Sequence, residues 1–395
     1  MDVFQEALEL HKKFKGKLDI KIKFPITSRK DLSLAYTPGV AQPCREIAKD
    51  PARVYDYTIK GNTVAVISDG SAVLGLGNIG GLASIPVMEG KAALFKEFAD
   101  IDSFPICIAN QNIDIVEFVK NISPVFGGIN LEDISAPRCF EIEEKLQNIG
   151  IPVMHDDQHG TAVVVLAALI NAAKVTGKNF SELKVTISGA GAAGTAIAKM
   201  LLCVNIDPKI CTPVRNIIMC DRKGIIHRGR ADITEHKKEL AVLTNKKNIQ
   251  GTLSDALEGS DVFIGVSAPD IVSGEMIKRM APEPIVFAMA NPIPEIMPDK
   301  AKEAGATVVA TGRSDFPNQV NNVLGFPGIF RGALDAKATK INKEMLIAAA
   351  NALANCVHKP IPEQILPDPL DKTIVPKIAE AVKQAAIDTK VVRIE

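Results

Sequence analysis

Short apolar runs that end in a polar or glycine-rich turn are the feature that most constrains this chain. They recur along the sequence as TVAVISDG, FPICIANQN, IPVMHDD, KVTISGAG, NIIMCD, DVFIGVSAPD, IVFAMANP and TVVATG. Runs of this length suit strands that are buried on both faces of a parallel sheet. Helical patterns such as TAIAKMLLCV and SGEMIKRMA lie between many of them. The alternation predicts an α/β fold with mainly parallel sheets.

The length of 395 residues predicts more than one domain. Near Asp157 the strand-like run IPVMH gives way to a long apolar stretch, TAVVVLAALINAA. We place the domain boundary there, with a first domain over 1–160 and a second over 161–395. The proline-rich stretch from Lys359 to Pro376 predicts an irregular surface crossing. It leads to a last helix, KIAEAVKQAAI, in a tail that is able to pack back on the first domain.

The charge balance argues for a small-molecule substrate. Lys and Arg number 46, and so do Asp and Glu, which leaves no overall field to attract nucleic acid or an acidic membrane surface. TAVVVLAALINAA is shorter than the roughly 20 residues of a membrane span, so it predicts a buried helix. The N-terminal MDVFQEALELHKKFKGK lacks the basic start and continuous apolar stretch of a signal peptide. We therefore expect a cytoplasmic protein.

The cysteines form no recognisable framework. They number seven and include no C-x-x-C pair: Cys44, Cys107, Cys139, Cys203, Cys211, Cys220 and Cys356. This spacing argues against disulfides and against a thiolate zinc site, and it fits a reducing compartment.

Two segments match the G-x-G-x-x-G pattern of a dinucleotide-binding turn. GAGAAG directly follows the strand-like LKVTIS and directly precedes a helical pattern, so that helix amides would face a pyrophosphate. The next expected strand, NIIMCD, ends in Asp221, where the adenosine ribose would lie. The sequence therefore assigns the cofactor to this turn, at Gly189, Ala190, Gly191, Ala192, Ala193 and Gly194.

The second match, GLGNIG, lacks this context. DGSAVL separates it from the strand TVAVIS, and the following GLASIPVMEGK contains a proline and another glycine that argue against an early helix. We expect a loop here and no pyrophosphate site.

The cofactor's identity stays open between NAD and NADP. Asp221 favours a free ribose hydroxyl and hence NAD. Arg222 and Lys223 follow it directly and are able to pair with the extra phosphate of NADP.

Two acidic pairs follow strand-like runs: Glu132 with Asp133, and Asp156 with Asp157. The carboxyl ends of parallel strands share one edge, so the pairs are able to meet there. Crowded carboxylates repel unless a cation neutralises them, and an all-oxygen set selects Mg²⁺ or Mn²⁺. Either pair alone is equally typical of a solvated surface. HDDQH has two histidines four apart, but it lacks the glutamate of the zincin motif, so we discount zinc.

Taken together, several ordered motifs resemble malic enzyme of the compact bacterial and archaeal type. They are AYTPGV, DGSAVLGLGNIGGLASIPVMEGKAALF, LEDI, HDDQHGTA, FAMANPIPE and TGRSDFPNQVNNVLGFPG, and they extend from about residue 34 through the second series of strands. The resemblance implies oxidative decarboxylation of L-malate to pyruvate and CO₂, with NAD or NADP and a divalent metal. It also implies a homodimer or higher oligomer in which the N-terminal region completes a neighbour's site.

The resemblance also implies roles for single residues. Tyr36 matches the general acid, Lys91 the general base and Asp156 the acid beside the metal ligands. Glu132, Asp133 and Asp157 match those ligands. The remaining matches are contacts to substrate and nicotinamide: Asn291, which directly follows an expected strand, and Asn321 and Asn322.

One position departs from the family pattern, and other functions would suit the same fold. Larger members carry an arginine for the substrate carboxylate where this chain has Ala72. A malolactic enzyme or an oxaloacetate decarboxylase would use the same site. A metal-free amino-acid or methylene-folate dehydrogenase would share the two-domain plan, and a nucleotide-binding sensor without catalysis is a further alternative.

Overall fold

The first of two parallel sheets gathers the strands of residues 63–155. The structure is a computed structural model that describes residues 3–393. The strand order is β2 (Asp102–Cys107), β1 (Thr63–Ser68), β3 (Gly128–Leu131) and β4 (Val153–His155). Leu131 pairs with Ile67 on one side and with His155 on the other. The ends of β1, β3 and β4 therefore lie together at one edge of the sheet.

The second sheet lies in residues 184–311. Its order is β10 (Val308–Thr311), β9 (Ile285–Ala288), β8 (Val262–Gly265), β5 (Lys184–Ser188), β6 (Asn216–Asp221) and β7 (Gly224–Ile225). All pairs are parallel except the short hairpin of β6 and β7. The α/β class with mainly parallel sheets is confirmed, and every apolar run named above contains a strand.

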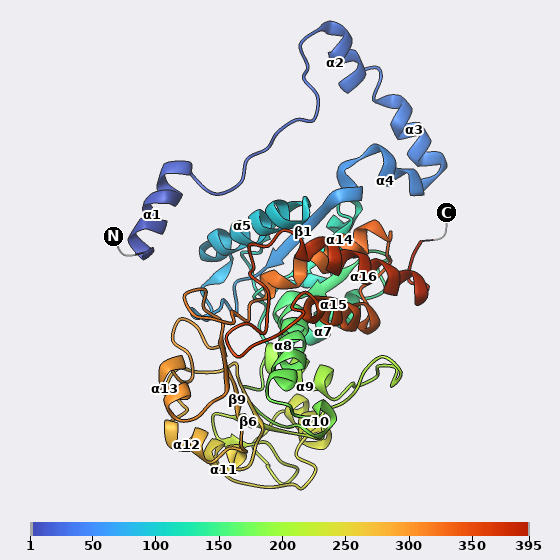
Figure 1. Cartoon of the computed structure of the whole chain (residues 1–395). Coiled ribbons are helices and arrows are strands. Elements are labelled where there is room, and N and C mark those ends of the chain that lie inside the picture. Colours follow the sequence, from blue (N-terminus) through green and yellow to red (C-terminus); the bar gives the residue numbers. More distant parts are fainter. Residues whose placement is uncertain (1–2, 394–395) are drawn as a thin grey trace.

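Most helices cover these sheets. With the first sheet are η2 (Ile59–Asn62), α5 (Gly80–Ala99), α6 (Ile115–Ile122), η3 (Ser123–Val125) and α7 (Arg138–Leu146). With the second are η4 (Phe180–Glu182), α9 (Ala192–Leu201), α10 (Glu235–Leu243), α11 (Leu253–Leu257), α12 (Gly274–Lys278) and α13 (Pro298–Glu303). Figure 1 shows the two sheets and their helices joined end to end through the long helix α8.

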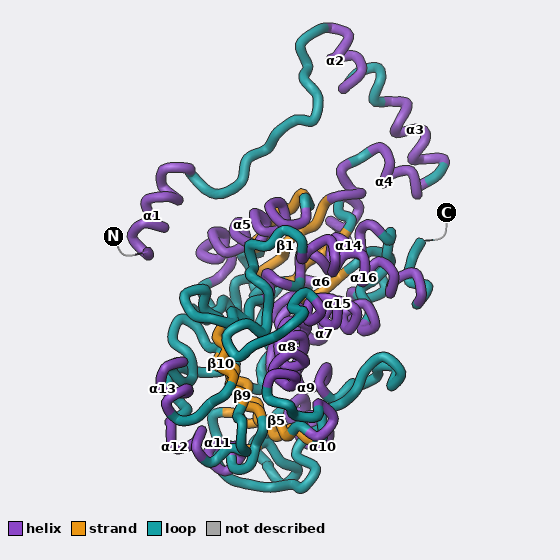
Figure 2. The backbone as a smooth tube through the Cα atoms, viewed as in Figure 1, coloured by secondary structure: helices purple, strands orange, loops and turns teal. Residues whose placement is uncertain are grey.

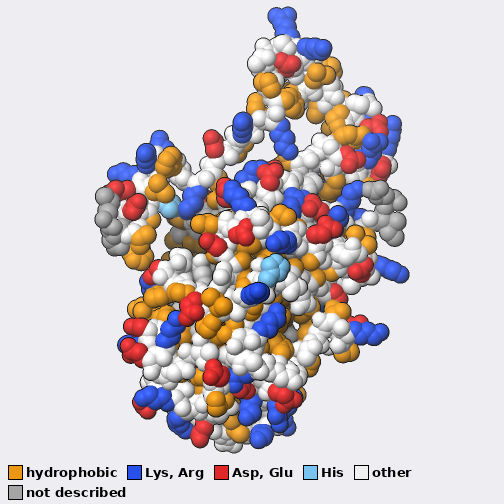
Figure 3. All heavy atoms as spheres, in the orientation of Figure 1, with side chains coloured by type: hydrophobic (Ala, Val, Ile, Leu, Met, Phe, Trp, Pro, Cys, Tyr) orange, Lys and Arg blue, Asp and Glu red, His pale blue; other side chains and the backbone are white. Residues whose placement is uncertain are grey.

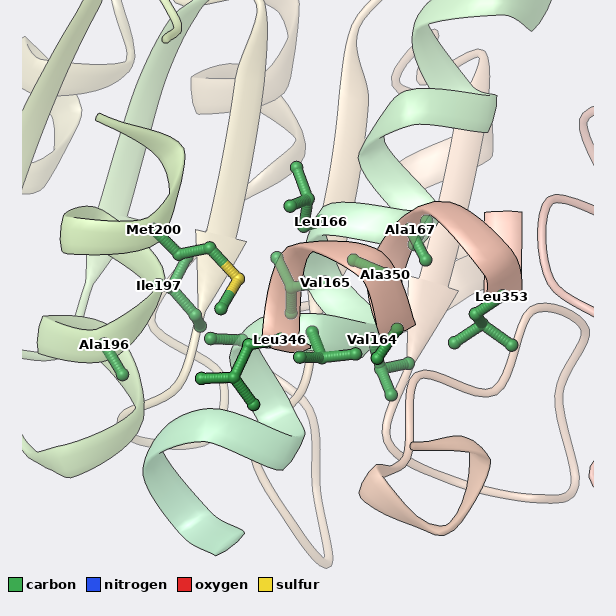
Figure 4. Packing of buried hydrophobic residues seen from close by; sticks show 14 of the residues in the cluster. Val164, Val165, Leu166, Ala167, Ala196, Ile197, Met200, Leu346, Ala350 and Leu353 are labelled. Carbon is green, nitrogen blue, oxygen red and sulfur yellow. The ribbon is translucent and has the colours of Figure 1, made fainter. Parts of the chain in front are cut away.

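Helix α8 (Asp156–Val175) is the centre of the largest hydrophobic core. Val164, Val165, Leu166 and Ala167 of α8 lie among side chains of α9 and of α15 (Lys343–Asn355), as Figure 4 shows. Those neighbours include Ala196, Ile197, Met200, Leu346, Ala350 and Leu353. By length and composition α8 would pass for a membrane span, but it is largely buried inside the protein. The predicted buried helix is confirmed.

The C-terminal part of the chain returns to the first sheet. It contains η5 (Asn322–Leu324), α14 (Phe326–Asp335), α15 (Lys343–Asn355) and α16 (Ile374–Asp388). Both α14 and α16 contact α5, and Phe95 of α5 packs edge-on against Phe326 and Phe330 of α14. The tail thus packs back on the first sheet, as the sequence suggested.

The N-terminal arm, residues 3–57, projects from the rest of the molecule (Figure 1). It comprises α1 (Val3–Phe14), α2 (Arg29–Ala35), α3 (Ala41–Lys49), η1 (Pro51–Arg53) and α4 (Val54–Tyr57). A long loop joins α1 to α2 (Figure 2). No described residue of α1, α2 or α3 is buried. Apolar side chains are exposed along the arm (Figure 3), among them Phe4, Leu8, Ile20, Ile22 and Leu34.

Two expectations were wrong. The stretch after GLGNIG is helical: α5 begins at Gly80 and runs through Pro86. Pro86 can donate no hydrogen bond to Leu82, but Leu82 is largely exposed, so water is able to satisfy its carbonyl, and packing on β1 and β2 holds the helix. Cys203 and Cys211 form a disulfide, because the turn after α9 brings their Cα atoms to 5.8 Å. A separation of eight residues resembles no known framework.

Candidate active site

The GAGAAG turn joins β5 directly to α9, as the sequence predicted. Gly189 has a φ of +119°, and a Cβ on Gly194 would lie 1.9 Å from the Gly189 carbonyl oxygen, so the helix approaches the strand as only glycine permits. A Cβ on Gly191, at the start of α9, would meet no atom within 4 Å. The space beside Gly191 at this helix start is therefore open, which fits the close approach of a pyrophosphate.

Asp221 ends β6 and is held by two cations. Arg230 Nη1 lies 2.8 Å from Asp221 Oδ1, and Lys237 Nζ lies 2.6 Å from Oδ2. Burial raises the pKa of Asp221, but these bonds outweigh it and hold the pKa at about 2. Arg222 is exposed beside it. The sequence reasoning missed Arg230 and Lys237, which come from the segment after the hairpin and show no pattern.

The two acidic pairs meet at the edge of the first sheet. Glu132 and Asp133 follow β3, and Asp157 lies in the first turn of α8, directly after β4. One carboxylate oxygen from each of these three residues lies within 4.8 Å of the other two. The backbone amide of Asp133 also donates to Asp157 Oδ2 at 2.8 Å.

The acid cluster carries an unbalanced negative charge. Burial raises the pKa of Glu132 to about 7, of Asp133 to about 9 and of Asp157 to about 6, and repulsion among neighbouring carboxylates adds to each shift. Asp133 Oδ2 is buried without a hydrogen-bond partner. Three crowded carboxylates with a free oxygen fit a hard divalent cation such as Mg²⁺ or Mn²⁺.

Lys91 lies on α5 beside this cluster and is buried. Its Nζ lies 2.6 Å from Asp156 Oδ2 and 2.9 Å from Glu132 Oε1, and 4.3 Å from the centre of the Phe326 ring. Burial alone would lower the pKa of Lys91, but the charges of Asp156 and Glu132 outweigh it and raise the pKa. The same burial raises the pKa of Asp156 to about 7. In the protein by itself, these two carboxylates therefore hold Lys91 as the protonated ammonium.

The GLGNIG loop bridges the two sheets. The backbone amide of Ala72 donates to the Asp133 carbonyl at 2.9 Å. Gly75 has a φ of +76°, and a Cβ there would lie 2.9 Å from the carbonyl oxygen of Asn291, just past β9. The segment from Ala72 to Gly75 thus joins the Glu132–Asp133 turn to the second sheet. Ala72 itself is exposed and offers no charge for a substrate carboxylate.

Two of the three predicted asparagines border this junction. Asn291 packs against Gly75 as described, and a Cβ on Gly160 of α8 would lie 3.3 Å from Asn322 Cβ. Asn321 caps η5 by accepting from the Val323 amide at 3.0 Å. Asn322 therefore flanks the turn of α8 that carries Asp156, and Asn321 shapes the same segment.

Tyr36 is not brought to the site. It follows α2 in the N-terminal arm, and its side chain is 68% exposed. Figure 1 shows α2 at the far end of the arm, well away from α5. The structure therefore brings Lys91 and the four carboxylates of Glu132, Asp133, Asp156 and Asp157 together. Tyr36, the predicted general acid, lies outside this group.

The sequence reasoning also missed a buried carboxylate behind the site. Glu143 on α7 accepts hydrogen bonds from the His155 amide, from Gln158 Nε2 and from His159 Nε2. Burial raises its pKa, but the two histidines outweigh this and lower the pKa. His155 ends β4, and its buried ring nitrogens have no hydrogen-bond partner in the described structure. No motif signals Glu143, which lies within an ordinary helical pattern.

Comparison with known proteins agrees with this geometry. Residues 15–115 match the family described as "Malic enzyme, N-terminal domain", and residues 158–387 match "Malic enzyme, NAD binding domain". The second match alone covers more than half of the chain. The chain belongs to the malic enzyme family.

Named malic enzymes resemble it over more than three quarters of their lengths. A "Bifunctional malic/malolactic enzyme" of Bacillus subtilis is 55% identical, covering 100% of this chain and 95% of that protein. An "NAD-dependent malic enzyme" of Geobacillus stearothermophilus is 55% identical over 96% of this chain and 78% of its own. An "NADP-dependent malic enzyme" of Halomonas elongata is 49% identical over 98% of this chain and 94% of its own.

Solved malic enzyme structures have the same fold. The NAD-dependent malic enzyme of Thermotoga maritima superposes with a TM-score of 0.91 at 51% identity, covering 95% of this chain and 98% of the other. The malic enzyme of Pyrococcus horikoshii gives 0.92 at 48% identity, covering 100% and 92%. The Rossmann-type second sheet is thus the NAD-binding part of a malic enzyme.

Proposed function

We propose that this chain catalyses the oxidative decarboxylation of L-malate to pyruvate and CO₂, with reduction of NAD or NADP and with a divalent cation. The observation that carries the proposal is the contact of Lys91 with Asp156 and Glu132 beside a three-carboxylate cluster. The GLGNIG loop connects this cluster to the nicotinamide side of the second sheet through Gly75 and Asn291.

The residues divide the chemistry between them. Lys91 is the base that accepts the proton of the C2 hydroxyl while a hydride leaves for the nicotinamide. Asp156 orients the Lys91 amine through their bond. Asn291 lies just past β9 beside Gly75, and Asn322 lies beside the first turns of α8, so we assign their amide groups to the binding of nicotinamide and substrate. The GAGAAG turn receives the pyrophosphate.

Glu132, Asp133 and Asp157 would hold the cation. When bound there, Mg²⁺ or Mn²⁺ supplies Lewis-acid stabilisation for the substrate oxygens and offsets the negative charge that keeps Lys91 protonated. Because these carboxyl groups have raised pKa values in the chain alone, cation binding should release protons.

Tyr36 is the acid that protonates C3 after loss of CO₂, and we propose that it comes from a second copy of the chain. The exposed Tyr36 and the exposed apolar side chains of the N-terminal arm support this arrangement. Residues Tyr36 and Lys91 then belong to one site only in a homodimer or higher oligomer.

Both NAD and NADP remain candidate cofactors, and two other reactions remain candidates at the same site. The relatives include proteins named for NAD and for NADP, and one named as malic and malolactic. A malolactic enzyme would retain the reduced cofactor and yield lactate from the same residues. Oxaloacetate decarboxylation would omit the redox step.

One assay separates these reactions. Malate, Mn²⁺ and either NAD or NADP are mixed with the chain, and nicotinamide absorbance is followed together with pyruvate and lactate. Reduced cofactor and pyruvate should appear in equal amounts. Lactate without net reduction would establish the malolactic reaction instead, and turnover that survives a chelator would argue against the metal.

The proposed partners are small molecules and a second copy of the chain, without nucleic acid or membrane. We propose the cytoplasm as its location. Five cysteines are free, as a reducing compartment favours, although the Cys203–Cys211 disulfide runs against that argument.

A further inference from the structure

Glu143 gathers three hydrogen bonds from a single five-residue stretch. Its Oε1 accepts from the His155 amide at 2.9 Å, and its Oε2 accepts from Gln158 Nε2 at 3.0 Å and pairs with His159 Nε2 at 2.9 Å. All three partners belong to HDDQH, which also carries Asp156 and Asp157. One buried carboxylate thus binds the backbone amide just before the two acids and two side chains just after them.

We infer that Glu143 is a positioning residue for catalysis, which fixes the first turn of α8 so that Asp156 meets Lys91 and Asp157 meets the Glu132–Asp133 turn. This inference rests on the proposed function of those acids. Glu143 touches neither substrate nor cofactor in this assignment, and it acts through the backbone and side chains of the α8 turn.

The first turn of α8 needs hydrogen bonds from outside because no side chain of its own caps it. Helix α8 begins at Asp156, and the preceding His155 makes no side-chain cap. Asp156 and Asp157 would ordinarily be free to cap this helix start, but their carboxylates are committed elsewhere. Asp156 Oδ2 binds Lys91, and Asp157 Oδ2 accepts from the Asp133 amide. Glu143 supplies from α7 an acceptor for the amide of His155, just before the helix, and for the side chains of Gln158 and His159 in its first turn.

Helix α7 is itself anchored at the same sheet edge. Its first residue, Arg138, forms an ion pair with Asp69, which directly follows β1, and donates to the Gln111 carbonyl. Phe140, one turn before Glu143, stacks on His236 of α10 with ring centres 4.5 Å apart. Contacts with residues of both sheet regions therefore hold helix α7 in place. The Glu143 carboxylate on this helix is fixed in position relative to the acids of α8.

The carboxylate matters because it has two acceptor oxygens. A glutamine of the same size keeps one oxygen and presents an NH₂ group to at least one of the donors. The chain should still fold in Glu143→Gln, but the α8 turn should lose part of its restraint. Glu144, the next residue on α7, is exposed, which makes Glu144→Gln the matched control.

The experiment compares the full-length wild type, Glu143→Gln and Glu144→Gln. Mn²⁺ affinity is read from the electron paramagnetic resonance of the free ion, dinucleotide affinity from fluorescence, and kcat and KM from the malate assay. For Glu143→Gln we expect the Mn²⁺ dissociation constant to rise about tenfold and kcat to fall by a similar factor, as for residues behind metal ligands. Dinucleotide affinity should change less than twofold, and Glu144→Gln should match wild type throughout.

A second variant tests the same network at Gln158, which donates to Glu143. Gln158→Met removes one donor and keeps the volume, so it should weaken Mn²⁺ binding in the same direction by a smaller factor. Combined with Glu143→Gln it should add less than its separate effect, because both changes break one network. This variant also decides the question if Glu143→Gln does not fold.

Two results would overturn the inference. One is an unchanged Mn²⁺ dissociation constant and kcat in folded Glu143→Gln and Gln158→Met. The other is a loss of dinucleotide affinity as large as the loss of Mn²⁺ affinity, which would mark Glu143 as a general structural residue. If the wild type binds Mn²⁺ but does not oxidise malate, the proposed function fails, and the affinity comparison still decides the role of Glu143.

Discussion

At the scale of single residues, the charge state of Lys91 depends on its neighbours. Asp156 and Glu132 hold its ammonium protonated in the chain alone. A base must lose that proton, so the cluster has to be partly neutralised before Lys91 can act. Phe326, with its ring 4.3 Å from Nζ, excludes water on one side and strengthens every charge interaction there.

Replacement of Lys91 should therefore abolish turnover without unfolding the nucleotide site. In Lys91→Met we expect kcat to fall by a factor of about 10² to 10⁴, the usual contribution of a general base. Dinucleotide affinity, measured by fluorescence, should remain. Lys96→Met, on the same helix but half-exposed and paired with Asp100 and Asp102, is the control and should keep wild-type turnover. A kcat within threefold of wild type in Lys91→Met would contradict the base role.

The acid cluster predicts an unusual pH dependence of stability. Glu132, Asp133 and Asp157 have folded pKa values above their unfolded ones, so each favours the folded state only while it is protonated. The melting temperature of the metal-free protein should therefore fall as pH rises from about 4, the pKa of an unfolded carboxyl group, to about 9, the folded value of Asp133. Groups with lowered pKa, such as Asp221 at about 2, titrate below this window.

Calorimetry with and without Mn²⁺ checks this expectation. Stabilisation by Mn²⁺ should grow with pH, because the cation competes with protons for the same oxygens. Asp157→Asn should flatten the pH dependence and weaken the response to Mn²⁺. A metal-free melting temperature that rises between pH 6 and pH 9 would contradict the assignment of an uncompensated acid cluster.

At the scale of elements, we propose that the ion pairs formed by Asp221 at the end of β6 govern the choice between NAD and NADP. Asp221 at the end of β6 is bound by Arg230 and Lys237, so its carboxylate is not free to accept from a ribose hydroxyl. The same cations are available to a 2′-phosphate. Cofactor preference therefore depends on this ion-pair group, and not on Asp221 alone.

Lys237→Ala should shift the preference toward NAD. It frees one Asp221 oxygen and removes a cation, so the ratio of kcat/KM for NAD to that for NADP should rise by about tenfold, the value of one charged hydrogen bond. Lys238→Ala is the control, because Lys238 is exposed and pairs with Glu235 instead. An unchanged ratio in Lys237→Ala would place the determinant elsewhere, for instance at Arg222.

The elements differ in how far the sequence predicts them. Buried parallel strands are continuous apolar runs, so eight of them could be read in advance, together with the acids at their ends. Strand β7 has two residues and depends on the turn at Arg222 and Lys223. Helix α5 was missed because local propensity penalises Pro86, whereas packing against the first sheet decides the outcome. Arg230, Lys237 and Glu143 reach the site only through tertiary contacts, which no local pattern encodes.

At the scale of the whole molecule, the N-terminal arm exposes apolar side chains that the rest of the chain does not cover. It is tied to α5 by Lys17, which donates to the Glu89 carboxylate and to the Pro86 carbonyl, and near its end Arg393 lies over the ring of Tyr55. Exposed apolar patches of this kind mark protein–protein contacts. The motif order of the sequence made Tyr36 a candidate acid, and the family resemblance alone, without support from any residue pattern, implied that the N-terminal region completes a neighbour's site.

Complementation between two inactive variants tests the assembly. Tyr36→Phe and Lys91→Met should each be nearly inactive alone. If the partner subunit's Tyr36 completes the site, co-refolded mixtures should recover about a quarter of wild-type activity, since half of the dimers are mixed and half of their sites are intact. Size-exclusion chromatography verifies the dimer. No recovery from verified mixed dimers would show that Tyr36 serves the site of its own chain.

Helix α8 couples the catalytic acids to the hydrophobic core, and this coupling limits which core substitutions leave activity unchanged. Its first turn carries the two acids, and its later turns fill the core that α9 and α15 share. A substitution that tilts the helix in that core also displaces the carboxylates at its end. Selection for heat resistance at Val164 or Val165 would therefore alter turnover at the same time, and libraries that repack this core should be screened for both properties together.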